Sequence, residues 1–69
     1  MFKVGDRVTV YSEKIPYNGT IMATNVKEVP VPGLAEPYKF DEERYAILSD
    51  EGNITYPKMN DNHLDICHE

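Results

Sequence analysis

A chain of 69 residues with 41% hydrophobic residues and a net charge of −5 has the composition of one small globular domain. The apolar content argues against an intrinsically disordered chain. The acidic balance argues against unspecific binding to nucleic-acid phosphates, which needs a basic face. Residues 35–69 carry most of the negative charge, with three basic residues against nine acidic ones.

The sequence also indicates a compartment. A single cysteine, Cys67, cannot form a disulfide within the chain, which is typical of a reducing environment. No stretch approaches the ~20 apolar residues of a membrane span, and no basic segment followed by an apolar run marks a signal peptide. We therefore expect one cytoplasmic domain over residues 1–69, monomeric or weakly dimeric, without a membrane contact.

The N-terminal region predicts a turn followed by a strand. Gly5 and Asp6 are turn residues, and they lead directly into alternating apolar and polar residues over 7–11. The alternation places Val8 and Val10 on one face of this strand, where they suit a core.

The next segment predicts a loop and then a long second strand. Residues 12–18 contain loop formers, and Asn18 with Gly19 is typical of turn chemistry. Residues 20–29 are rich in β-branched side chains and predict a strand that is bent. The Pro-Val-Pro-Gly run at 30–33 ends this strand, because proline cannot donate a hydrogen bond to a sheet.

The second half predicts a hairpin and a short final strand. Residues 30–42 have no clear period and predict a long loop, whereas residues 44–49 and 53–56 alternate as strands. Gly52 suits the left-handed position of the turn between these two strands. After them we expect a 3₁₀ turn over 57–62 and a strand over 64–67, in which Leu64 and Ile66 share a face and Tyr45 lies partly in the core.

This strand order resembles the SH3-like β-barrel superfamily. The start Gly5-Asp6-Arg7-Val8, followed by Gly19-Thr20-Ile21, is similar to the KOW-type subgroup. Residues 45–56 resemble small, uncharacterised SH3-like proteins of bacteriophages and prophages. The resemblance implies an all-β, five-stranded barrel with a long loop between its second and third main strands. It also implies a phage or prophage accessory protein that binds a host protein in the host cytoplasm.

The sequence offers little for metal binding or catalysis, and we expect no cofactor and no enzymatic activity. His63, Cys67 and His68 do not have the paired spacing of a structural zinc site. Ser12 and Ser49 lack a nucleophile elbow. Adjacent acidic residues in a loop are typical of a solvated face, and a barrel of this size offers no deep cleft.

Aromatic residues are the stronger signal, and the first candidate is an aromatic binding face. Its members come from the first strand, the loop after it and the end of the hairpin: Tyr11, Tyr17 and Tyr56. Peptide-binding SH3 domains place tyrosines in similar regions of the chain. The absence of tryptophan argues against a true proline-peptide groove, and tyrosine also suits half-buried strand positions without any binding role.

The loop over residues 30–42 is the second candidate binding element. It carries the apolar residues Leu34, Tyr38 and Phe40 beside an acidic run, Asp41, Glu42 and Glu43. Apolar side chains on a loop either pack against the domain or bind a partner. Because the barrel is small, packing is the expectation. Otherwise the acidic rim would steer a basic protein surface to an apolar anchor.

The sequence thus predicts a non-enzymatic protein-interaction module. One alternative is a KOW-like module for nucleic acid or ribonucleoprotein, which would use the basic residues of the N-terminal half: Lys3, Arg7, Lys14 and Lys27. A further alternative is a small non-catalytic subunit of an enzyme complex.

Overall fold

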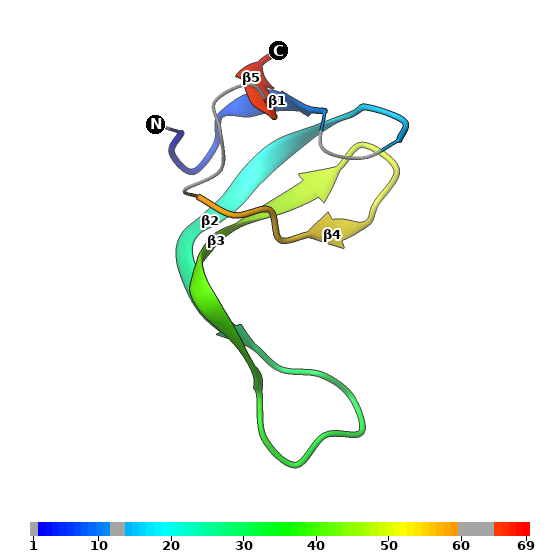
Figure 1. The fold of residues 1–69 in the computed structure, drawn as a ribbon. Helices are drawn as coiled ribbons and strands as arrows, with labels where there is room; N and C mark the ends of the chain where they lie inside the picture. The colour runs from blue at the N-terminus through cyan, green and yellow to red at the C-terminus, as the bar shows by residue number, and fades with distance from the viewer. Residues whose placement is uncertain (1, 12–13, 60–64) are drawn as a thin grey trace.

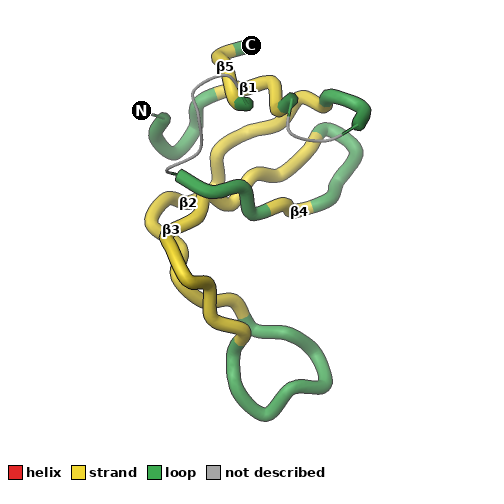
Figure 2. Tube along the Cα trace, in the orientation of Figure 1, coloured by secondary structure: helices red, strands yellow, loops and turns green. Residues whose placement is uncertain are grey.

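The computed structural model describes residues 2–11, 14–59 and 65–69, and these residues form an all-β structure without helices. Five antiparallel strands make one open sheet in the order β4-β3-β2-β1-β5 (Figures 1 and 2). The strands are β1 (Arg7–Val10), β2 (Tyr17–Val29), β3 (Tyr38–Ser49), β4 (Ile54–Thr55) and β5 (Ile66–His68). The all-β prediction is confirmed. Within the described ranges, no helix is long and apolar enough to cross a membrane.

The predicted turn before β1 is present. The amide of Asp6 donates to the carbonyl of Lys3 at 3.0 Å, and the Asp6 carboxylate accepts from the amide of Lys3 at 3.0 Å. Strand β1 then ends at Val10, so Tyr11 lies just beyond it. Val8 and Val10 are both fully buried, as their alternation predicted.

Gly19 lies within a strand and not in the predicted turn. Strand β2 begins at Tyr17, and Gly19 lies inside it, opposite Val8 on one side and Ser49 on the other. A Cβ atom on Gly19 would lie 2.7 Å from Cγ2 of Ile47 and 2.7 Å from the carbonyl oxygen of Leu48. Gly19 is therefore required for close strand packing, and the turn chemistry that Asn18-Gly19 suggested is not used.

The core lies where β1, β2, β3 and β5 meet. Its buried residues are Val8, Val10, Ile21, Tyr45, Ile47 and Ile66. Phe2, Tyr17 and Met59 pack against its margin. Ile21 faces Ile47 across the β2–β3 pair, so the longest strands meet in the middle of the core. The predicted core role of Tyr45 is confirmed, with 3% of this residue exposed.

Beyond the core, β2 and β3 continue together as a long two-stranded arm (Figure 1). The pairing runs from Gly19 opposite Ser49 out to Val29 opposite Tyr38, with register shifts in between. Asn25 has a φ of 58°, and its amide side chain donates to the Glu43 carboxylate at 2.8 Å. A register shift between paired strands bends the strand and changes where its side chains point. The sequence predicts such a bend in β2.

The loop predicted over residues 30–42 is shorter in the structure, because its second part belongs to the arm. Strand β3 begins at Tyr38, so Tyr38, Phe40 and the acidic run belong to a strand, and the connecting loop covers only 30–37. The loop begins where the proline run ends β2. Gly33 has a φ of 90° and follows Pro32 in a turn closed by the 3.1 Å bond from the amide of Leu34 to the carbonyl of Val31. Proline followed by glycine suits this turn geometry.

The hairpin from β3 to β4 follows the prediction closely. Gly52 has a φ of 95°, and its amide donates to the carbonyl of Ser49 at 2.9 Å. Residues 57–59 then run beside β3, with Lys58 opposite Arg44, instead of starting the predicted 3₁₀ turn. The rest of that turn and Leu64 lie outside the described residues, and the last strand is displaced by one residue at its end to Ile66–His68.

We predict that Gly19→Ala destabilises the fold. The added methyl group would overlap a core side chain and a backbone carbonyl, and the backbone atom cannot rotate away. Overpacking of this kind costs about 1–3 kcal/mol. Urea unfolding monitored by far-ultraviolet circular dichroism measures the loss. An unfolding free energy within ~0.5 kcal/mol of the unmodified protein would contradict the packing described for β2 and β3.

Candidate functional site

The two predicted binding elements meet in one aromatic series. Along the arm, the ring centroids of Tyr38 and Phe40 lie 5.4 Å apart, and those of Phe40 and Tyr56 lie 5.7 Å apart. Arg44 adds a cation, with its guanidinium carbon 4.7 Å from the Phe40 centroid. Its Nη1 also donates to the carbonyl of Tyr56 at 2.9 Å. Tyr56 was predicted with one surface and Tyr38 and Phe40 with the other, and the structure joins them.

The outer end of the arm is open to solvent. All residues over 30–39 are exposed, including Leu34 at 56% and Tyr38 at 55%. The expectation that these side chains pack on the body is therefore wrong. A hollow of about 580 Å³ lies at this tip, lined by Leu34, Ala35, Glu36, Pro37, Tyr38 and Lys39. Two large apolar side chains, Leu34 and Tyr38, are therefore exposed together at the tip of the arm.

The acidic run does not act as a single rim. Glu43 accepts a hydrogen bond from Asn25 at the β2 bulge, and Glu42 forms a 3.3 Å ion pair with Lys58. These two carboxylates therefore help to fix the base of the arm. Asp41 is exposed.

Tyr17 and Tyr11 have different environments from Tyr56. The Tyr17 hydroxyl lies 2.5 Å from the Thr55 hydroxyl, and its ring packs against the core. Tyr11 is 51% exposed, and its amide donates to the carbonyl of Asp65 at 2.6 Å. Among the described residues, no ring contact joins either of them to Tyr56.

A second hollow, of about 360 Å³, lies beside Tyr17 between the segment that precedes β2 and the β3–β4 turn. It is lined by Ile15, Pro16, Tyr17, Ser49, Glu51, Asn53 and Thr55. Ile15 is 81% exposed at its edge. Tyr17 is thus accessible from one side, although its hydroxyl group is held by Thr55.

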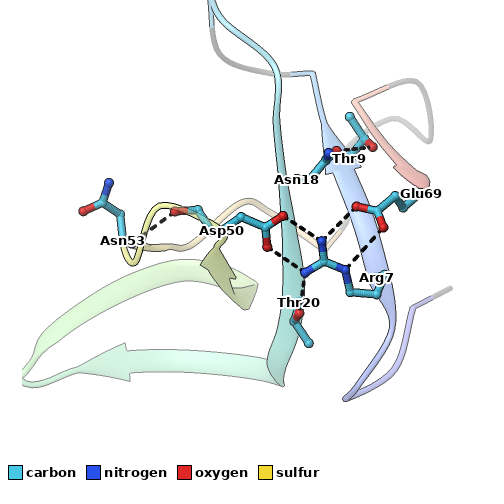
Figure 3. A network of polar contacts seen from close by, with 8 residues as sticks. Arg7, Thr9, Asn18, Thr20, Asp50, Asn53 and Glu69 are labelled. Carbon is cyan, nitrogen blue, oxygen red and sulfur yellow. Dashed lines mark hydrogen bonds and ion pairs between the residues drawn. The ribbon is translucent and has the colours of Figure 1, made fainter.

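Arg7 lies at the centre of an ion-pair network on β1 (Figure 3). Its guanidinium donates two 2.7 Å hydrogen bonds to Asp50 and further bonds to Glu69 and to the Thr20 hydroxyl. The hydrogen bond with Arg7 lowers the pKa of Asp50, and the bonds to Asp50 and Glu69 raise the pKa of Arg7. Arg7 therefore links β1 to the β3–β4 turn and to the residue after β5.

This network leaves Arg7 engaged with carboxylates that a phosphate would have to displace. The other predicted basic residues, Lys3, Lys14 and Lys27, are exposed. They come from the turn before β1, the segment before β2 and the arm.

The described residues that were considered for metal binding and catalysis do not form a cluster, and Ser49 and His68 contact other residues of the fold. In the described part of the chain, no group of three His, Cys, Asp or Glu residues is placed to hold a metal ion. Cys67 is exposed, and the His68 ring packs 4.7 Å from that of Phe2. Ser49 is buried, and its hydroxyl accepts the amide hydrogen of Asn53 at 3.1 Å. His63 and Ser12 lie outside the described residues.

Arg44 is the residue of this site that sequence reasoning missed. The sequence predicts Arg44 only as the start of a strand, although residues four apart on a regular strand share a face, so this spacing also predicts a cation beside Phe40. Its Nε atom is buried without a hydrogen-bond partner in the described structure, so the Phe40 ring and the Tyr56 carbonyl supply its observed contacts.

No protein-family model, curated protein or solved structure matches this chain.

We predict that the Arg7–Asp50 pair contributes to stability above about pH 4 and loses this contribution at lower pH. The pKa of the Asp50 carboxyl in the folded state lies below its unfolded value near 4, so protonation of Asp50 on acidification favours unfolding. Asp50→Asn should therefore lower the thermal midpoint at neutral pH, and the difference from the unmodified protein should shrink at about pH 2–3.

Glu51→Gln is the matched control, because Glu51 is the exposed neighbouring acid in the same turn. Its thermal midpoint should follow that of the unmodified protein at both pH values. If Asp50→Asn showed an equal loss at both, the pair would not be the source of the effect.

Proposed function

We propose that this protein is a non-enzymatic protein-interaction module that binds its partner through the outer end of the β2–β3 arm. The exposure of Leu34 and Tyr38 in one hollow at the tip carries this proposal. These side chains would be expected to pack on the body if the arm served only stability. Their exposure costs hydrophobic free energy that binding to a partner would recover.

We also propose an SH3-like barrel as the fold of the body. Support comes from the order of the strands, in which consecutive strands are neighbours and β5 lies beside β1. Within the described residues, this order lacks only a β4–β5 pairing to complete a ring of strands. The resemblance of residues 45–56 adds the proposal of a phage or prophage protein that acts on a host protein in the host cytoplasm.

Nucleic-acid binding is the less favoured alternative. The net charge of −5 opposes association with a polyanion, and Arg7 already binds Asp50 and Glu69. The exposed lysines of the N-terminal half are the observation on its side. A role as a non-catalytic subunit of an enzyme complex remains compatible with the first proposal, since such a subunit also binds a protein.

The first test of this function is the double variant Leu34→Ala/Tyr38→Ala. Both side chains are exposed, so the fold should be retained while partner binding weakens by more than ~1 kcal/mol for each anchor residue. The partner is captured from a bacterial lysate with the unmodified protein, identified by mass spectrometry, purified and titrated by isothermal calorimetry.

Tyr11→Ala is the control, because Tyr11 is similarly exposed but lies on the body. It should bind the partner with unchanged affinity. A partner that binds the double variant as tightly as the unmodified protein would show that the arm is not the binding element. A loss with Tyr17→Ala instead would indicate the hollow beside Tyr17.

For nucleic acid, we predict no measurable binding to random duplex DNA or RNA at physiological salt. Counterion release favours proteins with a basic face, and this chain carries excess negative charge. Fluorescence anisotropy at low and physiological salt measures the binding. Submicromolar, salt-sensitive binding that falls on mutation of Lys3, Lys14 and Lys27 would establish the KOW-like alternative.

A further inference from the structure

Three chemical types of side chain that line the hollow at the tip of the arm matter for what it can bind: aromatic, aliphatic and acidic. Tyr38 presents an aromatic ring, Leu34 and Pro37 present aliphatic surface, and Glu36 presents a carboxylate. Tyr38 and Leu34 are each more than half exposed. A side chain with an aliphatic stem and a cationic head group would match all three types at once.

The arm already contains an example of such an interaction. The guanidinium of Arg44 lies over the Phe40 ring, with its carbon atom 4.7 Å from the centroid. Phe40 is in turn an edge-to-face neighbour of Tyr38, at 5.4 Å between centroids. Arginine stacks on aromatic rings through its planar, weakly hydrated head group, whereas lysine carries a compact and strongly hydrated charge. The same aromatic series therefore favours arginine at its open end.

The charge of the arm supports a basic occupant. Residues 27–44 carry three cations against five carboxylates, a net charge of −2, and one of these carboxylates, Glu42, is paired with Lys58. Among the described residues, Lys39 is the cation that lines the hollow, and it lies opposite Glu28 in the strand register. Glu36 is therefore the carboxylate that the hollow offers to an approaching arginine, and the exposed Asp41 adds a further negative charge on the arm.

We propose that the tip hollow binds an arginine side chain presented by the partner protein. The guanidinium stacks against Tyr38, its aliphatic stem packs on Leu34, and the Glu36 carboxylate accepts hydrogen bonds from it. This inference rests on the proposed function, because it names the chemistry of the partner that the arm recognises.

The test is an NMR titration of the intact protein with three blocked tetrapeptides. They are identical except for one central residue, which is arginine, lysine or citrulline; citrulline keeps the shape of arginine without its charge. We expect saturable shifts of the Tyr38 ring and Leu34 methyl resonances. The arginine peptide should bind most tightly, lysine more weakly and citrulline weakest. Added salt should weaken only the two charged peptides.

Variants of the hollow separate cation recognition from apolar docking. Tyr38→Leu retains apolar surface but removes the aromatic face, so it should weaken the arginine peptide about two- to fivefold. Tyr38→Phe should bind like the unmodified protein. Glu36→Gln should weaken arginine and reduce its salt dependence, while Tyr11→Leu on the body should change nothing.

Equal binding of the arginine and citrulline peptides would overturn the inference, and so would shifts that do not saturate or that lie away from the tip. Its failure is distinguishable from that of the proposed function. If the partner requires Leu34 and Tyr38 but the arginine peptide does not bind the tip, the proposed function stands and the arginine inference is wrong. If the arginine peptide binds the tip but the partner does not require Leu34 and Tyr38, the proposed function is wrong and arginine recognition by the hollow stands.

Discussion

The antiparallel pairing of β2 with β3 is the interaction on which the rest of the structure depends. At one end this pair places Ile21 against Ile47 in the core, and at the other it places the half-buried Val29 opposite the exposed Tyr38. The register shifts around Asn25 separate the two ends. A bulge breaks the strict alternation of a strand, so the same two strands can bury their side chains in the body and expose them on the arm.

Two groups of side-chain contacts support the β2–β3 pair, one an ion-pair network and the other an aromatic series with a cation. The Arg7 network ties β1 to the β3–β4 turn through Asp50, and the aromatic series with Arg44 and Tyr56 supports the base of the arm. The first is exposed, and its strength depends on geometry, since bidentate pairs of arginine with carboxylate are the favourable kind. The second gives the arm a fixed base, so a side chain at its tip would lose less conformational freedom in the binding that we propose.

Local turn and strand chemistry made part of this structure predictable. The turn at Gly52, the end of β2 before Pro30 and the burial of Val8 and Val10 follow from backbone limits and alternation. The role of Gly19 was not predictable, because it depends on the approach of Ile47 and Leu48 from a strand far along the sequence.

The candidate site was predictable as residues but not as an arrangement. Tyr38, Phe40 and Tyr56 stood out as aromatic groups, yet the irregular pairing of residues 40–43 hid the strand that carries two of them. Arg7 illustrates the opposite case. Its charge suggested phosphate binding, and only the fold shows that Asp50 and Glu69 meet it there.

We propose that the outer arm serves recognition, and we expect the body to be stable without it. A variant in which Asn-Gly replaces residues 29–38 separates these two roles, because Glu28 and Lys39 already face each other and suit a two-residue hairpin turn. The deciding measurement is urea unfolding of this variant and of the unmodified protein, each with and without the captured, purified partner. Without partner, we expect the unfolding free energies of the two proteins to lie within about 1 kcal/mol of each other. Saturating partner should then stabilise only the unmodified protein. An unfolding free energy of the variant more than about 2 kcal/mol lower would show that the body needs the arm, and stabilisation of the variant by the partner would show that the arm is not the binding element.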